Sequence, residues 1–312
     1  MLIVNLVAMV GLTWWALRLS RYRHTVTTVL LVASLLLVSN GARNVVFAGQ
    51  STLLFVVGVY LALTSSKETA GAVGVFIALI KPGFGIPLLV FIAAIGWYRR
   101  ATVGTAATVA VSSIMMIPFV IWAGGFGSLL EILSDNLAFS AESEGISLAT
   151  THARVDASAT VTALFDVVPS GGVQLAITAA VMGAASAALY TRRSLLRQAP
   201  ARDAAVVLVC LAMILGTYHS FYDLPLLLLP ALLAARHDFA GGGAAPAIRW
   251  TILGALAVAA FNPFRVSLVI DALDLSHRSV VFLGTGLTGL AVVIAFTLAV
   301  RLVWHLPDPR SV

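Results

Sequence analysis

Long apolar stretches separated by short polar breaks run through almost the whole chain. Eleven stretches can be counted, at approximately 2–17, 25–39, 45–64, 69–80, 83–97, 102–123, 173–191, 204–218, 221–235, 250–262 and 279–303. A helix needs about 20 apolar residues to cross the roughly 30 Å hydrocarbon core of a bilayer, and several stretches are shorter. The pattern predicts an all-α polytopic membrane protein with about 11 transmembrane or re-entrant helices, forming a single membrane domain over 1–312.

One apolar run, 69–97, is interrupted only at Lys81-Pro82-Gly83. Proline has no N–H group and disfavours helix at the residue before it, so the helix should break at Lys81. The arm from Ser65 to Ile80 would rise about 24 Å as a helix, which is short of the core thickness. A lysine is costly in hydrocarbon and is therefore a functional candidate. We expect a short helical hairpin with Lys81 at its tip, close to one face of the membrane.

Composition supports a membrane protein and excludes several other classes. The chain is 60% hydrophobic and 10% charged, with a mean hydropathy of +1.01, whereas a soluble domain is closer to a quarter charged. The net charge of +6 does not indicate nucleic acid, because the basic residues fall in short loops between apolar segments. Cys210 is the single cysteine, so no disulfide framework exists. Nucleotide-binding, zinc and common hydrolase motifs do not occur, and we expect no cofactor and no metal.

Positive charge sets the expected orientation, because cytoplasmic loops are enriched in Lys and Arg. When the hairpin is counted as two arms, 14 of the 19 Lys and Arg fall in loops on one side. The other five are Arg43, Lys81, Arg154, Arg265 and Arg278. A single crossing by 69–97 would invert every later loop and place most of the basic residues outside. We therefore expect an extracytoplasmic N-terminus, a cytoplasmic C-terminus and a long extracytoplasmic loop at 124–172, in a multi-pass protein of the cell membrane.

The expected outer loops hold the candidate binding residues. Lys81 suits a phosphate or carboxylate, because an ammonium in a partly dry setting needs an anion; a lysine that snorkels to the interface is the alternative. Arg43, Asn44 and Gln50 place a cation and two amides at an outer edge, although helix–helix hydrogen bonds would also explain the amides. Arg154 stands in an otherwise acidic loop and is a candidate contact for an anionic substrate. In the same loop, 127–140 is typical of an amphipathic helix on the membrane surface.

A second group lies in the sequence GTYHSFYDLPLLLLP. His219 and Asp223 are four residues apart and would share one face of a helix, with Tyr218 and Tyr222 as a second pair beside them. Aromatic rings together with a histidine and a carboxylate suit a sugar, because rings stack on its faces and polar groups bind its hydroxyls. An interfacial belt of aromatic residues with a capping Asp is the alternative.

These residues carry a resemblance to glycosyltransferase family 87. The motifs that carry it are Gly49-Gln50 before an apolar span, Ala70-Gly71, Lys81-Pro82, Arg99-Arg100 and the polar, aromatic turn of Tyr218–Pro230. The family consists of polyprenyl-phosphate-mannose-dependent mannosyltransferases with the GT-C membrane fold. The resemblance covers roughly 40–235, and the remainder matches only in hydropathy.

The resemblance implies transfer of mannose, with inversion, from a polyprenyl-phosphate donor to a hydroxyl of a lipid or glycan acceptor of the cell envelope. Lys81 would hold the phosphate, helped by Arg43 or Arg154, with His219 close to the donor. Family members usually carry a catalytic Asp in the first outer loop. No acid precedes Glu68 here, so the chain looks like a member without its first helix and first outer loop, and Asp223 is the resident substitute as catalytic base.

Two other classes of function stay open. In a transporter or flippase, Lys81 and His219 would line a path for an anionic or lipid-linked substrate. In a structural partner subunit, these residues would only hold helices together.

Overall fold

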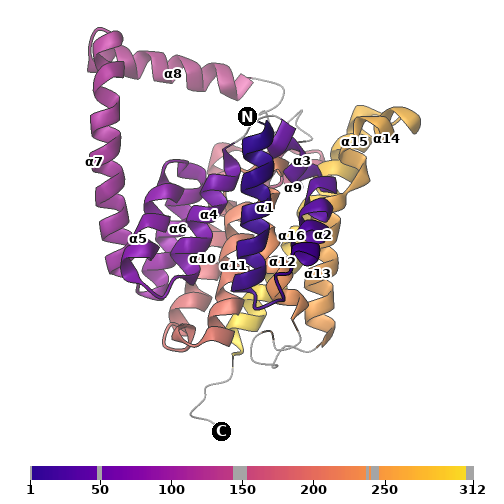
Figure 1. Cartoon of the computed structure of the whole chain (residues 1–312). Coiled ribbons are helices and arrows are strands. Elements are labelled where there is room, and N and C mark those ends of the chain that lie inside the picture. The colour runs from indigo at the N-terminus through magenta and orange to yellow at the C-terminus, as the bar shows by residue number, and fades with distance from the viewer. Residues whose placement is uncertain (1, 48–50, 143–152, 237–238, 240–245, 307–312) are drawn as a thin grey trace.

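The computed structural model describes residues 2–47, 51–142, 153–236, 239 and 246–306 (Figure 1). Within these ranges the protein is helical, and the only extended pairing is an isolated antiparallel bridge between Arg154 and Ser220. The prediction of an all-α protein is confirmed. The helices are α1 (Leu2–Leu19), α2 (Val26–Val38), α3 (Asn40–Phe47), α4 (Thr52–Thr64), α5 (Glu68–Leu79), α6 (Pro82–Ile95), α7 (Tyr98–Trp122), α8 (Phe126–Glu142), α9 (Ala157–Phe165), α10 (Gly171–Thr191), η1 (Leu195–Arg197), α11 (Ala199–Gly216), η2 (Phe221–Leu227), α12 (Leu228–Ala235), α13 (Pro246–Phe261), η4 (Pro263–Arg265), α14 (Ser267–Ala272), α15 (His277–Val281), η5 (Phe282–Gly286) and α16 (Leu287–Trp304).

Five segments of the described chain are long and apolar enough to cross a membrane, as expected of a helical membrane protein. They are α1, α7, α10, the Pro246–Arg265 segment and the His277–Trp304 segment. Helices α2 and α3 would make a sixth span, but they meet at 89°. The other apolar helices, namely α4, α5, α6 and the Phe221–Ala235 segment, are shorter. The predicted count of about 11 crossing or re-entrant helices is therefore not confirmed.

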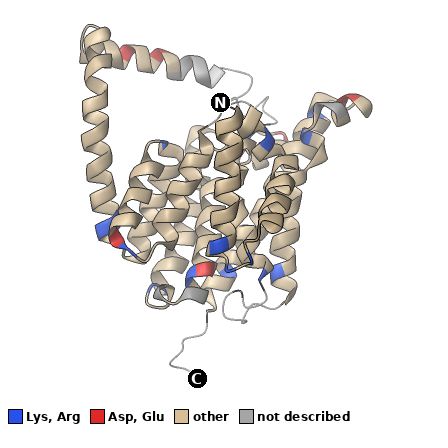
Figure 2. Cartoon of the chain, in the orientation of Figure 1, with Lys and Arg blue, Asp and Glu red and all other residues tan. Residues whose placement is uncertain are grey.

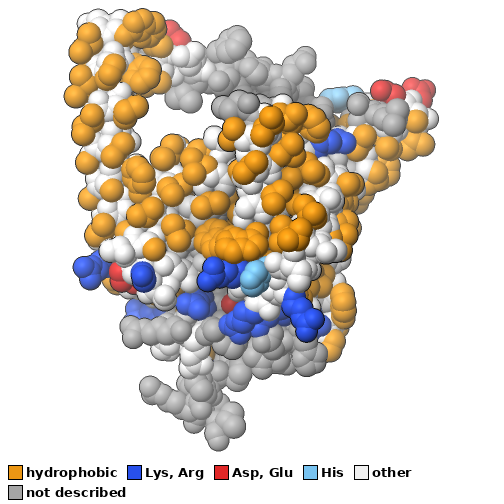
Figure 3. All heavy atoms as spheres, viewed as in Figure 1, with side chains coloured by type: hydrophobic (Ala, Val, Ile, Leu, Met, Phe, Trp, Pro, Cys, Tyr) orange, Lys and Arg blue, Asp and Glu red, His pale blue; other side chains and the backbone are white. Residues whose placement is uncertain are grey.

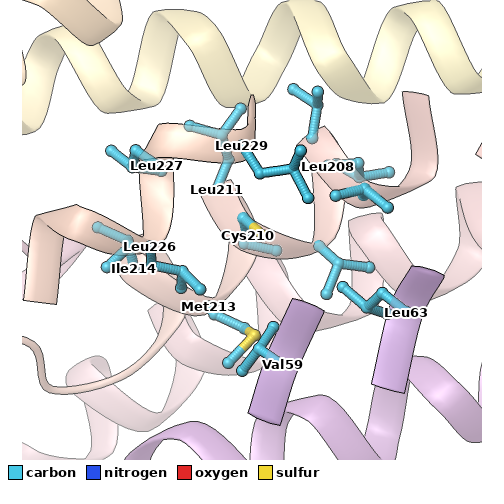
Figure 4. Packing of buried hydrophobic residues seen from close by; sticks show 14 of the residues in the cluster. Val59, Leu63, Leu208, Cys210, Leu211, Met213, Ile214, Leu226, Leu227 and Leu229 are labelled. Atoms are coloured by element: carbon cyan, nitrogen blue, oxygen red, sulfur yellow. The ribbon is translucent and has the colours of Figure 1, made fainter. Parts of the chain in front are cut away.

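Helix α11 forms the centre of the core. Every side chain from Ala204 to Leu215 is buried, as expected of a helix that is apolar on all sides. Figure 4 shows residues of α11, among them Leu208, Cys210 and Met213, packed against Val59 and Leu63 of α4. Leucines of η2 and α12 complete the cluster, and the buried Cys210 serves in it as a packing residue.

Two stretches between predicted apolar segments contain helix. Residues 40–44, between the predicted segments 25–39 and 45–64, form the first half of α3, because Ser39 adopts an extended backbone that ends α2 and lets a new helix begin at Asn40. The loop expected at 124–172 contains two helices. One of them, α8, agrees with the amphipathic helix predicted at 127–140, and the other is α9, whose first turn is capped by the Asp156 side chain.

Helices α7 and α8 form an arm that stands away from the helix bundle (Figure 1). Near its start, α7 packs on α5, where Gly104 lets the backbone approach Ala72 and Val75 closely. The rest of α7 is largely exposed, and α8 runs across its far end. Figure 3 shows open space bounded by α7, α8 and the helix bundle.

Charge is divided between the two ends of the bundle. In Figure 2, most of the Lys and Arg residues lie at the lower end of the bundle in that view. Ion pairs of this end join helices that are distant in sequence: Arg236 Nη1 lies 2.9 Å from Asp203 Oδ2, and Arg100 Nη2 lies 2.9 Å from Glu68 Oε1. We refer to this as the basic end, and Lys81 lies toward the opposite end.

Candidate functional site

Lys81 lies at the break between α5 and α6, as the sequence predicts. Its backbone is extended, with φ −109° and ψ 102°, and Pro82 opens α6 where a missing N–H costs no helical hydrogen bond. The Arg100–Glu68 ion pair joins the first turn of α7 to the first turn of α5, so the two helices begin at the same height in the bundle. With 12 residues in α5 and 25 in α7, the two helices rise about 18 Å and about 37 Å from that level. Lys81 therefore lies about halfway along α7, deeper than a position at the end of a membrane-spanning helix.

Lys81 belongs to a compact polar cluster centred on Asp223. Lys81 Nζ donates to Asp223 Oδ1 at 2.6 Å, and Thr52 Oγ1 donates to the same oxygen at 3.3 Å. His219 Nδ1 lies 2.8 Å from Asp223 Oδ2. The side chains of Asp223 and His219 are 1% and 0% exposed, whereas that of Lys81 is 27% exposed. Lys81 is therefore the member of the ion pair that an incoming ligand can reach.

The cluster fixes the tautomer of His219. A carboxylate can only accept hydrogen bonds, so the His219 Nδ1 atom must carry the proton that lies between them. In the neutral ring, Nε2 then carries a lone pair. Nε2 is buried and has no hydrogen-bond partner within the described part of the chain.

The proximity of His219 and Asp223 was predicted correctly, but a different backbone produces it. His219 and Ser220 are extended, and the 3₁₀-helix η2 begins only at Phe221. The extended segment pairs with residues 153–155, since Val155 N donates to His219 O at 3.0 Å and Phe221 N donates to Ala153 O at 2.8 Å. This pairing aims the two side chains at each other without a shared helical face.

The buried hydroxyl of Tyr60 holds the end of η2 through hydrogen bonds to its backbone. Pro225 has no N–H group, so η2 cannot continue as a regular helix through this residue. Tyr60 Oη accepts from Leu229 N at 2.9 Å and lies 2.9 Å from Leu226 O and 3.2 Å from Pro225 O, the carbonyls to which it can donate. A residue of α4 thereby satisfies backbone groups at the junction of η2 and α12, and it holds the segment that carries Asp223.

Aromatic rings surround the cation. Lys81 Nζ lies 4.7 Å from the ring centre of Phe84 and 5.1 Å from that of Tyr222. The Phe84 ring also packs edge-on against His219, with ring centres 4.9 Å apart. Tyr218 is exposed and lies under the Arg154 guanidinium, at 4.7 Å. The expected pair of tyrosines is thus divided, because each ring faces a different cation.

Arg154 lies next to this cluster but has an anionic partner of its own. Its Nε donates to Asp156 Oδ2 at 2.7 Å, and both side chains are buried. Arg265 holds the same segment from the other side, donating from Nη2 to Arg154 O at 3.1 Å and from Nε to Gly284 O at 3.1 Å. An anionic ligand would therefore compete with Asp156 for Arg154.

The remaining predicted site residues lie apart from the cluster or cannot be placed. Arg43 is half-buried in α3, and the Asn44 side chain donates to Asn40 O one turn earlier, which fits a packing role better than a binding role. No hydrogen bond of the described residues joins either of them to Asp223. Gln50 lies outside the described residues.

Sequence reasoning missed Thr52 and Phe84. In the sequence, Thr52 is a hydroxyl residue shortly after Gln50, and Phe84 is an aromatic residue one turn after Lys81. Neither feature is specific to a functional site. Their roles depend on the packing of α4 and α6 around η2, which brings them to Asp223 and His219.

The described residues contain no group of three or more His, Cys, Asp or Glu side chains that could hold a metal ion. Comparison with protein-family models, curated proteins and solved structures gives no match.

Proposed function

We propose that this chain is a membrane glycosyltransferase that moves a sugar, mannose by the resemblance to glycosyltransferase family 87, from a polyprenyl-phosphate donor to a hydroxyl of a lipid or glycan acceptor. The observation that carries the proposal is the partly exposed Lys81 ammonium, which lies between the buried Asp223 carboxylate and the rings of Phe84 and Tyr222. A polar cluster of this kind in an apolar helical protein is a functional site by default.

The depth of Lys81 favours a lipid-linked donor. An ammonium about halfway along a helix of about 37 Å lies below the level of the lipid headgroups when that helix spans the bilayer. A water-soluble sugar nucleotide would have to leave water to reach it. A phosphate attached to a long apolar chain can reach this depth from within the membrane, with its sugar next to the exposed Tyr218 ring.

The residues of the cluster suit the chemistry of inverting transfer. The acceptor oxygen forms a bond to the anomeric carbon while the bond from that carbon to the phosphate oxygen breaks, and the polyprenyl phosphate leaves with the electron pair. Lys81 stabilises the charge that develops on the phosphate. The acceptor proton passes to His219 Nε2, which the hydrogen bond from Nδ1 to Asp223 holds in the required tautomer. Because Nε2 is buried in the structure, this step requires side chains that cover His219, such as Phe84, to move when the acceptor binds. Asp223 therefore acts by orienting Lys81 and His219.

The division of charge favours one orientation of the site in the membrane. With the basic end in the cytoplasm, as the excess of Lys and Arg favours, the Lys81 cluster opens toward the extracytoplasmic side of the plasma membrane. The proposed partners are then the donor lipid, the acceptor and the surrounding membrane lipids.

Release of polyprenyl phosphate from polyprenyl-phosphate mannose by membranes containing the protein tests the proposal without knowledge of the acceptor. We expect Lys81→Ala to lower this release by about 100-fold or more, the scale of one lost electrostatic contact to a leaving group. Lys81→Arg should retain part of the activity. Lys67→Ala removes an exposed lysine outside the cluster and should change nothing. Equal rates for Lys81→Ala and Lys67→Ala would exclude the phosphate role.

Transport of a lipid-linked or anionic substrate is the second candidate function. It is favoured by one observation: both Asp223 and His219 are fully buried and engaged, as charged residues along transport pathways often are. Movement of polyprenyl-phosphate mannose between the leaflets of proteoliposomes, without its consumption, would support transport over transfer.

A further inference from the structure

The basic end carries a second feature, a groove between α1 and α2. The two helices run in opposite directions and are joined by a short turn around Arg21. Between them lies a cavity of about 460 Å³, whose walls are apolar side chains such as Val7, Val10 and Leu30 and whose lower end is formed by Trp14 and His24. None of the residues that line the groove belongs to the Lys81 cluster, and the groove plays no part in the proposed transfer.

The groove is open and apolar. Val7 and Val26 are 68% and 76% exposed, although both are hydrophobic. At Gly11, which also lines the groove, an added Cβ would have no atom within 4 Å. In a membrane protein such an apolar surface faces hydrocarbon, and an open apolar groove in it is a binding surface for an aliphatic chain.

Positive charge gathers where the groove reaches the basic end. The Arg18 guanidinium lies 5.7 Å from the ring of Trp14, and that ring meets His24 edge-on at 6.1 Å. Arg18 and Arg23 are exposed and form no ion pair with a described residue. Asp203, the acid nearest to this turn, already pairs with Arg236 and Arg21. Below the hydrophobic side chains, Figure 3 shows the Lys and Arg side chains as a band across this face.

We propose that the α1–α2 groove binds one phospholipid with an anionic headgroup. An acyl chain lies between the helices, and the phosphate lies beside Arg18, Arg23 and His24. Trp14 sits at the level where indole rings favour the membrane interface, and its ring joins the apolar groove to the basic residues. A headgroup with net negative charge gains from both arginines, whereas a zwitterionic headgroup carries its own cation and gains little.

The purified full-length chain in detergent allows a direct measurement. Native mass spectrometry counts the lipids retained from an equal mixture of phosphatidylglycerol and phosphatidylcholine with identical acyl chains. We expect preferential retention of phosphatidylglycerol. The preference should fall roughly fivefold for each of Arg18→Gln and Arg23→Gln, since one basic residue near a charged membrane surface contributes about that factor. Arg99→Gln removes an equally exposed arginine of the same end and should leave the preference unchanged.

A second pair of variants tests the acyl-chain part. Gly11→Leu places a side chain in the groove and should reduce retention of phosphatidylglycerol, while Gly183→Leu adds the same side chain at an equally open glycine of α10 and should not. Both variants should be at least as stable to heat as the parent chain after delipidation, because neither added Cβ meets another atom within 4 Å and leucine favours a helix more than glycine does. Equal retention of the two lipids by the parent chain would overturn the proposal, and so would equal retention of phosphatidylglycerol by the two leucine variants. Displacement of the lipid by inorganic phosphate alone would also overturn it, because that result would indicate a simple anion site.

Discussion

Lys81 Nζ and Asp223 Oδ1 lie 2.6 Å apart although 142 positions separate the two residues in the chain. Lys81, which stands alone in an apolar stretch of the sequence, therefore forms an ion pair inside the protein. Its need for an anion is met within the protein, so a ligand phosphate must share Lys81 with Asp223 or replace it. This relationship gives the first prediction.

Asp223→Asn should destabilise the protein by about 2 kcal/mol, because it leaves Lys81 partly buried without its charge partner; the loss stays below the roughly 3–5 kcal/mol of a fully buried pair since Lys81 is partly exposed. The double variant Lys81→Met with Asp223→Asn should recover much of this loss. Thermal unfolding of the four proteins in one detergent forms a double-mutant cycle. Strict additivity of the two single effects would show that the pair contributes nothing.

His219 can be tested through its two ring nitrogens separately. His219→Asn places an amide N–H near the position of Nδ1, so it should keep the hydrogen bond to Asp223 while removing Nε2. His219→Ala removes both groups. If His219 accepts the proton of the acceptor, both variants should lose transfer of the sugar by about 100-fold or more, while only His219→Ala should lose stability. Normal transfer by His219→Asn would show that Nε2 takes no part in the reaction.

Much of this site could be predicted from the sequence, because a few of its residues are unusual in an apolar membrane segment. Lys81 interrupts an apolar run next to a proline, and these two facts alone placed it between two helices. His219 and Asp223 were expected together from their spacing. Their proximity is real, but it comes from the bridge between Arg154 and Ser220, which no local pattern encodes. The sequence alone does not show that residues 153–155 pair with residues 219–221.

The predicted count of membrane crossings is not confirmed, for a related physical reason. An apolar run of 12 to 14 residues looks the same whether it crosses part of a bilayer or lies inside a helical bundle. Helices α4, α5 and α6 are of this kind and pack against one another and against α11, so tertiary contacts replace part of the contact with lipid. Charge counting, in contrast, depends only on which loops share an end, and Figure 2 shows most Lys and Arg residues at one end of the bundle.

The proposed orientation can be measured with single cysteines. Cys210, the only native cysteine, is completely buried, so an introduced cysteine at an exposed position should be the accessible thiol. Lys67→Cys lies at the basic end and His277→Cys at the opposite end, and both parent residues are exposed. On intact cells, a membrane-impermeant maleimide should label His277→Cys, whereas Lys67→Cys should react only after the membrane is opened. The reverse pattern would place the basic end outside.

Arg265 should control the segment that holds His219. Its guanidinium donates to the carbonyls of Arg154, Ala153 and Gly284 and lies 5.5 Å from the Phe221 ring, so it joins η4 and η5 to the two paired segments. In Arg265→Gln this fork of donors is lost, and the amides of Val155 and Phe221 should exchange with deuterium at least several-fold faster, because their mutual pairing opens more often. Arg265→Lys keeps the charge but lacks the planar fork of the guanidinium, and it should give an intermediate rate. Arg278→Gln breaks an exposed pair with Asp166 on the neighbouring surface and serves as the control. Unchanged exchange at both amides in Arg265→Gln would mean that the bridge between Arg154 and Ser220 stands without Arg265, and its support would then have to come from the Arg154–Asp156 pair and the cap of α9.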